Sequence, residues 1–167
     1  MAVPFTLLVL SLLLVAAWRD VATRTIPDAV SLLIAAVGTV IRLRDGPLAL
    51  TLSAASALLL FIVLLIAFSR GVLGGGDVKL MTALAIALPP LGSYHFAVAT
   101  AVAGGVLAVA YLVLSRLLPA PHQAKRRAVL GRVAAIESWR IRRRGPLPYG
   151  VAIAAGGAFA LLHPGGF

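Results

Sequence analysis

The sequence predicts an all-α membrane protein, with about six transmembrane helices in a single domain over residues 1–167. Two observations predict this fold class. Of the 167 residues, 61% are hydrophobic and 12% are charged, and the mean hydropathy is +1.04. In soluble domains, by contrast, about a quarter of the residues are charged. Apolar runs also follow one another from end to end, which is typical of a polytopic helical protein rather than of a soluble domain with one anchor.

Six apolar segments are expected to be the spans, although some are shorter than the roughly 20 residues of a full crossing. They lie at about residues 3–18, 29–41, 47–68, 80–91, 94–118 and 149–163. The first segment lacks the positively charged start of a secretory signal, so we keep it as a span. Pro89 and Pro90 are expected to break or kink the fourth helix near its end.

Two connections between the spans have a distinctive composition. Ile26 and Pro27 impose an extended step before the second span. Three glycines, Gly74–Gly76, separate the third span from the fourth. Glycine permits positive φ and a close approach of backbones, so these residues are expected to turn tightly and to deliver Asp77 to the membrane boundary.

The basic residues are distributed unequally between the two sides of the membrane. With six spans, alternate loops face the same side, and only Arg42 and Arg44 fall on one of them. The other side receives Arg19, Arg24, Arg70, Lys79, Arg116, Lys125, Arg126, Arg127, Arg132, Arg140, Arg142, Arg143 and Arg144. The positive-inside rule assigns this basic side to the cytoplasm and both termini to the opposite side. Merging the fourth and fifth spans would divide the basic charges between the sides, so the six-span count is preferred.

The loop at residues 119–148 is the one sizeable segment outside the expected spans. Apolar residues recur at helical spacing among its arginines: Val129, Val133, Ile136 and Trp139. This pattern predicts a basic amphipathic helix that lies on the cytoplasmic leaflet and contacts anionic lipid head groups. A site for a protein partner or substrate is the alternative. Nucleic acid is not expected as a partner, because a single aromatic residue accompanies the charges.

The chain contains five acidic residues, Asp20, Asp28, Asp45, Asp77 and Glu137. Asp45 belongs to an Asp-Gly-Pro turn and Glu137 to the basic loop, so neither is assigned a function. The other three are expected at the cytoplasmic ends of spans. Carboxylates close to hydrocarbon are costly, and they face the interior of a bundle or a water-filled cavity.

Helix capping is the structural alternative for these three aspartates. Asp28 and Asp77 precede spans, where a carboxylate accepts backbone N–H bonds and complements the helix dipole. Asp20 follows the first span, where a negative charge opposes the dipole, so capping does not account for it. Two carboxylates brought close together, one protonated and one ionised, can activate water and protonate a leaving amine. A pair of these aspartates is therefore a candidate for such a dyad.

Three stretches of the chain resemble, in order, motifs of the type IV prepilin peptidases, which are GxGD membrane aspartyl proteases. DVATRTIPD, from Asp20 to Asp28, is similar to the first motif, an Asp followed by a basic residue and Ile-Pro-Asn. GGGDVK, at residues 74–79, is similar to the second motif, Gly-x-Gly-Asp with a hydrophobic residue and Lys after it. PLPYGVAIAAGG, at residues 146–157, is similar to the Pro-Tyr/Phe-Gly opening of the family's last helix.

The resemblance implies a membrane aspartyl endopeptidase with Asp20 and Asp77 as its catalytic pair, and it implies no cofactor and no metal. Its substrates would be prepilins or pilin-like proteins, cut on the cytoplasmic side of a hydrophobic N-terminal helix at the bacterial inner membrane. Longer family members carry an N-terminal Cys-rich zinc domain and methylate the new pilin N-terminus. This chain has no cysteine and begins in its first span. It therefore resembles the small peptidase-only type of tight-adherence (Flp) pili, and methylation is not expected.

Supporting roles are expected for other residues of these motifs, including Pro27, which sets the extended step before the second span. Gly74 and Gly76 are the paired glycines, beside which a substrate backbone has room to approach. Arg24 and Lys79 are candidates to hold a local charge, to favour an ionised carboxylate or to reach lipid head groups. Asp28 stands where the family has Asn, either as a conservative cap or as a third negative charge near the pair.

Three other functions are alternatives to a prepilin peptidase. A preflagellin peptidase would use the same chemistry, and a pilus assembly factor would retain the scaffold without catalysis. A small ion-coupled or proton-coupled carrier predicts inverted repeats and acidic residues near the bilayer midplane. The aspartates of this sequence instead fall at span ends on one side, which disfavours a carrier.

Overall fold

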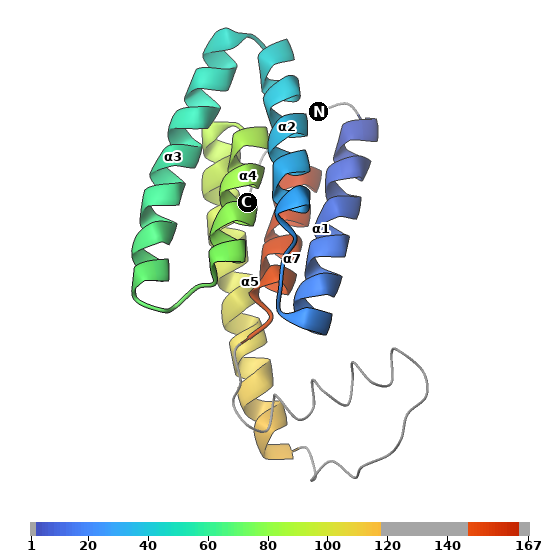
Figure 1. Cartoon of the computed structure of the whole chain (residues 1–167), viewed down its shortest axis with the longest axis vertical. Coiled ribbons are helices and arrows are strands. Elements are labelled where there is room, and N and C mark those ends of the chain that lie inside the picture. Colours follow the sequence, from blue (N-terminus) through green and yellow to red (C-terminus); the bar gives the residue numbers. More distant parts are fainter. Residues whose placement is uncertain (1–2, 118–146, 164–167) are drawn as a thin grey trace.

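The computed structural model describes residues 3–117 and 147–163, which form a bundle of six helices (Figure 1). The helices are α1 (Val3–Thr23), α2 (Asp28–Arg44), α3 (Pro47–Ser69), α4 (Gly75–Ala87), α5 (Pro90–Leu117) and α7 (Tyr149–Leu162). The described residues contain no strand, and the predicted all-α polytopic fold is confirmed. The amphipathic helix predicted around Val129 and Trp139 lies outside the described residues.

Two helices differ from the predicted spans at the ends that carry polar residues. α1 continues past Trp18 to Thr23, so Asp20 lies inside the helix rather than after it. α4 begins at Gly75, five residues before the predicted start of the span at residue 80. Hydropathy places a boundary at the first charged or glycine residues, whereas the helical hydrogen bonds continue through them.

A break at two prolines separates α4 from α5. Leu88 is extended, with φ −102° and ψ 151°, because a residue that precedes proline is disfavoured in the helical region. α5 then begins at Pro90, where the missing N–H of proline costs no helical hydrogen bond. The two segments are therefore separate helices, as the six-span count required.

α4 is the central helix of the bundle. It packs against α2, α3, α5 and α7, and its Leu80 and Leu84 are completely buried. A helix that is apolar around its whole circumference is expected at such a position. The neighbours of α4 therefore hold it in place, including the first turn, which carries Asp77.

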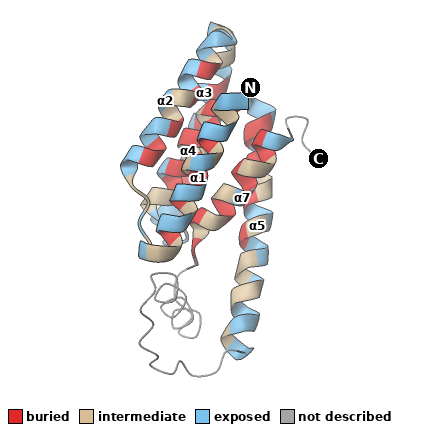
Figure 2. Cartoon of the chain, turned by 90° about the vertical axis from the view of Figure 1, so that its right-hand side faces the viewer, coloured by how far each residue is buried: buried red, intermediate tan, exposed pale blue. Residues whose placement is uncertain are grey.

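The outer faces of the longer helices are exposed (Figure 2), and many of the residues on them are large and apolar. More than half of each of the following side chains is exposed: Leu48, Leu59 and Val63 of α3, and Val102, Val106 and Val109 of α5. Soluble proteins rarely expose continuous apolar faces of this kind. By length and composition, α1, α3 and α5 are the described helices able to cross a membrane on their own.

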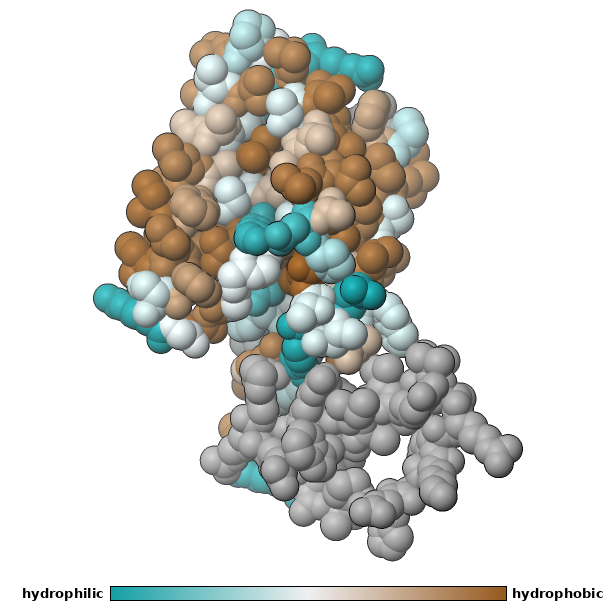
Figure 3. All heavy atoms as spheres, viewed as in Figure 1, coloured by the Kyte–Doolittle hydropathy of each residue, from teal (hydrophilic) through white to brown (hydrophobic). Residues whose placement is uncertain are grey.

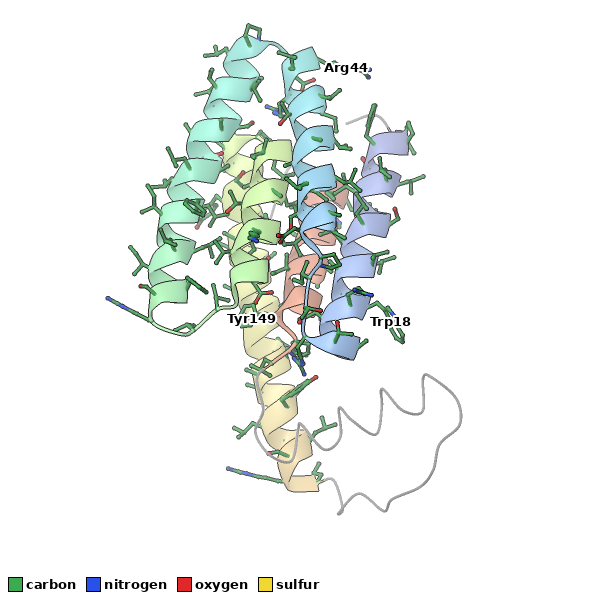
Figure 4. The ribbon with its side chains drawn as sticks, viewed as in Figure 1. Trp18, Arg44 and Tyr149 are labelled. Atoms are coloured by element: carbon green, nitrogen blue, oxygen red, sulfur yellow. The ribbon has the colours of Figure 1, made fainter. Side chains whose placement is uncertain are left out.

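The two ends of the bundle carry different groups (Figure 4). We call the end at which α1 finishes and α4 and α7 begin the motif end. The opposite end, where a turn joins α2 to α3, is the hairpin end. Trp18 and Tyr149 lie toward the motif end, and Arg44 lies at the hairpin end. There Arg42 donates a hydrogen bond to Asp45 at 2.7 Å, so Asp45 belongs to the turn as predicted.

We expect Gly38→Ala to destabilise the bundle. A Cβ at Gly38 would lie 2.7 Å from the Cβ of Ala87 and 2.8 Å from its Cα. α2 and α4 would then have to separate, at a cost of about 1–3 kcal/mol. The midpoint of thermal unfolding in detergent is expected to fall. Gly105→Ala is the control, since a Cβ there meets no atom within 4 Å. Equal midpoints for the two variants would contradict the tight crossing.

Candidate functional site

A cavity of about 270 Å³ opens at the motif end. Its lining comes from the last turns of α1, the α1–α2 connection and the starts of α2 and α4: Asp20, Arg24, Thr25, Ile26, Asp28, Gly74, Gly75, Gly76 and Asp77. Of the residues predicted for the site, Pro27 and Lys79 alone do not line this cavity. Thr25, Ile26 and Gly75 were not predicted individually, although they fall inside the two motif stretches.

Asp20 is buried in the last turns of α1 and is held there by α7. Its side chain is 7% exposed, and its Oδ2 accepts a hydrogen bond from the backbone N–H of Gly150 at 2.7 Å. A Cβ at Gly150 would lie 2.8 Å from the Cβ of Asp20. Only glycine therefore allows this approach. Gly150 was not predicted as a site residue, and the Pro-Tyr-Gly stretch was the one sequence signal for it.

The end of α1 turns the chain into the cavity. Arg24 adopts a left-handed conformation with φ 57°, and its N–H donates to the carbonyl oxygen of Asp20 at 2.9 Å. This conformation costs a non-glycine residue about 1–3 kcal/mol and is found mainly where the surrounding structure imposes it. Pro27, with φ −63° and ψ 134°, then provides the predicted extended step before α2.

Asp77 is the third residue of α4, and Gly74, three residues before it, is the N-cap of this helix. The N–H of Gly74 donates to Asp77 Oδ2 at 3.2 Å, which is the backbone half of a capping box. A Cβ at Gly74 would lie 3.0 Å from this oxygen, and one at Gly76 would lie 3.3 Å from the Cβ of Ile26. The glycines of the motif therefore permit close approach around the carboxylate.

The tight turn expected at Gly74–Gly76 does not use the positive φ that glycine permits. The positive φ in this connection belongs to Gly71, at +72°, which follows the end of α3. Gly74 is extended, with φ −79°, and Gly75 and Gly76 are already helical. The reversal of direction thus happens before the motif, and the motif glycines act through their missing side chains.

Burial and charge both act on Asp77, which lies outside the three long spanning helices. Desolvation raises the pKa of its carboxyl most, and the charge of Asp20 raises it further. The Gly74 hydrogen bond and the charge of Arg24 lower it, and together these effects place the pKa of Asp77 at about 6. Arg24 therefore acts as a local charge beside the carboxylate, one of the roles predicted for it.

Asp28 and Lys79 form an ion pair beside the cavity. Lys79 Nζ lies 2.8 Å from Asp28 Oδ1 and 3.0 Å from Oδ2, and both side chains are more than half exposed. Asp28 is the first residue of α2, and the N-cap is Pro27. The interpretation of Asp28 as an N-cap is therefore wrong, and its carboxylate binds Lys79 instead.

The geometry suits acid–base chemistry with two carboxylates. Asp20 and Asp77 line the same cavity, and the ionised form of one disfavours ionisation of the other. Such a pair can hold one proton between two acids, so one carboxylate can accept a proton while the other donates one. No group of three His, Cys, Asp or Glu side chains with the spacing of a metal site occurs in residues 3–117 and 147–163.

The fold is that of a polytopic membrane protein, and the site at its motif end has two carboxylates in one cavity. The model of the type IV leader peptidase family matches residues 7–109, which include both aspartates. The chain belongs to this family, and it is therefore a membrane protein of the peptidase class. No curated protein and no solved structure matches the chain. The stretch that contains Gly150 lies outside the matched residues.

We expect the carboxyl group of Asp77 to lose its proton near pH 6. Because the pKa is raised from 3.8 to about 6, Asp77 is mainly protonated below this pH and ionised above it. Infrared spectra recorded against pH should show a protonated-carboxyl band that fades through about pH 6 and is absent in Asp77→Asn. In Asp20→Asn the midpoint should fall but stay above 3.8, since desolvation remains. A midpoint unaffected by Asp20→Asn would refute the electrostatic contact.

Proposed function

We propose that the protein is a membrane aspartyl endopeptidase that removes the leader peptide of type IV prepilins or pilin-like proteins. Asp20 and Asp77 are its catalytic pair. The observation that carries this proposal is their position in one cavity, with the proton affinity of Asp77 raised by burial and by Asp20. Membership of the leader peptidase family supports the reaction class.

The two aspartates divide the proton transfers of peptide hydrolysis between them. The raised pKa of Asp77 keeps a proton within the pair near pH 6. One carboxyl group of the pair holds this proton, and the other carboxylate takes a proton from water. The water oxygen attacks the scissile carbonyl carbon, and the carbonyl oxygen receives the proton of the first carboxyl group. When the C–N bond breaks, the leaving amine takes a proton from the pair.

The motif end faces the cytoplasm of the bacterial inner membrane in this proposal. The described basic residues support this orientation. Arg19 lies in the last turns of α1 and Arg24 directly follows α1, Arg70 caps α3, and Lys79 lies in α4 near its start. Arg42 and Arg44 end α2 at the opposite end. The positive-inside rule then places both termini outside the cytoplasm.

The small peptidase-only type is the form of the family that we propose, with processing of Flp pilins and without methylation. A preflagellin peptidase would use the same pair on a different leader. Anionic lipid is the proposed partner of the basic loop. The carrier hypothesis has less support, because both aspartates lie toward one end of the bundle. A carrier would place its acids near the midplane.

Asp20→Asn and Asp77→Asn are each expected to reduce prepilin cleavage by about 10²–10⁴-fold, because each removes one proton transfer. Cleavage is measured by co-expression with a candidate prepilin and by assay of the purified enzyme in detergent. Asp45→Asn is the matched control, since it makes the same change at the hairpin end. Normal membrane levels of all three variants complete the comparison. Retention of cleavage in either dyad variant would exclude the proposed pair.

Asp28→Asn, which restores the residue of the family pattern, is expected to leave cleavage nearly normal. Both side chains of the Asp28–Lys79 pair are more than half exposed. Exposed ion pairs contribute about 0–1 kcal/mol to the stability of a protein. The amide oxygen of asparagine also remains able to accept a hydrogen bond from Lys79. Cleavage rates of the two proteins on one prepilin provide the measurement. Loss of activity would place Asp28 in the catalytic machinery.

A further inference from the structure

A second cavity lies beside the first, on the face formed by α2, α3 and α4. It has a volume of about 330 Å³, near the lower end of the range for ligand sites. Most of its lining is apolar and includes Leu32 and Ala35 of α2, Phe61 of α3, and Ala83 and Ile86 of α4. We call this cavity the α2–α4 groove.

The α2–α4 groove begins where the catalytic cavity ends. Asp28 lines both cavities, and Lys79, its ion-pair partner, lines the groove. α2 and α4 both run from the motif end toward the hairpin end, so Ala35 and Ile86 lie at the far end of the groove. Figure 3 shows a hydrophilic cluster within the hydrophobic surface of this face. A ligand in the groove would thus pass from a charged rim into an apolar channel.

Two hydroxyl groups interrupt the apolar lining of the groove. Ser31 belongs to α2 and Thr82 to α4. In the part of the chain that the structure describes, the buried hydroxyl of Thr82 has no hydrogen-bond partner. A lone buried hydroxyl is costly in an apolar setting.

We infer that the α2–α4 groove binds the apolar helix of the substrate, in the segment that follows the scissile bond. This inference rests on the proposed function. The first N–H groups of a helix have no partner within it and carry partial positive charge. The exposed side-chain oxygens of Asp28, at the rim of the groove, are acceptors suited to these groups, and the amide oxygen of an asparagine at this position would remain one. The residues before the helix would then extend into the cavity of Asp20 and Asp77.

The length of the groove and the small residues that line it suit this occupant. Seven residues of α2 separate Asp28 from Ala35, which corresponds to about 10 Å, or two turns of a parallel helix. Ala35 and Ala83 are small, and small residues allow helix backbones to approach closely in membranes. The groove therefore holds side chains from one face of the substrate helix and leaves its other face to lipid.

Filling the groove tests the inference. Ala35→Phe is expected to raise the KM for a prepilin with its complete apolar segment by about tenfold or more, the effect of losing one buried apolar side chain. Cleavage of a short peptide that contains the leader and the cut site, without the apolar segment, is expected to stay within about twofold of wild type. Ala36→Phe is the matched control, because Ala36 is exposed on the next position of α2. Equal effects of the two variants on the prepilin would overturn the inference.

Photo-crosslinking provides a second measurement that does not depend on catalysis or on tolerance of phenylalanine. The chain has no cysteine, so Ala35→Cys and Ala36→Cys each carry a single benzophenone label. With Asp77→Asn added, the prepilin stays uncut. The label at position 35 should capture the apolar segment of the prepilin, and the label at 36 should not. Adducts with lipid alone at position 35 would overturn the inference. Failure of wild-type cleavage would instead count against the proposed function.

Discussion

The burial of one carboxylate inside a membrane bundle is the constraint on which the rest of this structure depends. Asp20 is 7% exposed, and a buried polar group is tolerated only when it is hydrogen-bonded. Asp20 accepts a hydrogen bond from the backbone N–H of Gly150. The first turn of α7 therefore has to lie directly against α1. Other glycines allow α7 to pack equally closely along the rest of its length. A Cβ at Gly157 would meet Leu13 of α1 at 2.8 Å, and one at Gly156 would meet the backbone of Thr100 in α5 at 2.6 Å.

The sequence predicted most of the fold, because hydropathy and the distribution of basic residues report directly on burial in a membrane. It also predicted that Asp20 and Asp77 belong together, through motifs that lie far apart in the chain. The helix ends were harder to predict. Asp20 looked like the end of a span because the group that satisfies it, the N–H of Gly150, lies 130 residues away. Every residue except proline has a backbone N–H, so a sequence alone does not show which of them donates to a given carboxylate. Only the Pro-Tyr-Gly stretch indicated where this donor lies.

The ion pair of Asp28 and Lys79 explains two residues that the sequence left open. The carboxylate stands where the family pattern has Asn, and the structure places it 2.8 Å from a lysine of another helix. The extra negative charge of Asp28 is thereby balanced by Lys79, which does not line the cavity of Asp20 and Asp77. The partners are 51 residues apart, so the separate interpretations of each residue could not include the other. The same pair also marks the boundary between the polar cavity and the apolar groove.

The shortness of α4 has a consequence for the surrounding bilayer. α4 has 13 residues and α3 has 23, which at 1.5 Å per residue correspond to roughly 20 Å and 35 Å. The hydrocarbon core of a membrane is about 30 Å thick. In Figure 1 the turn between α4 and α5 lies well short of the turn between α2 and α3. The bundle therefore has a hydrophobic mismatch at one end of its central helix. Bilayers accommodate such a mismatch by thinning locally, so a change in the thickness of the host membrane would act on the helix that carries Asp77.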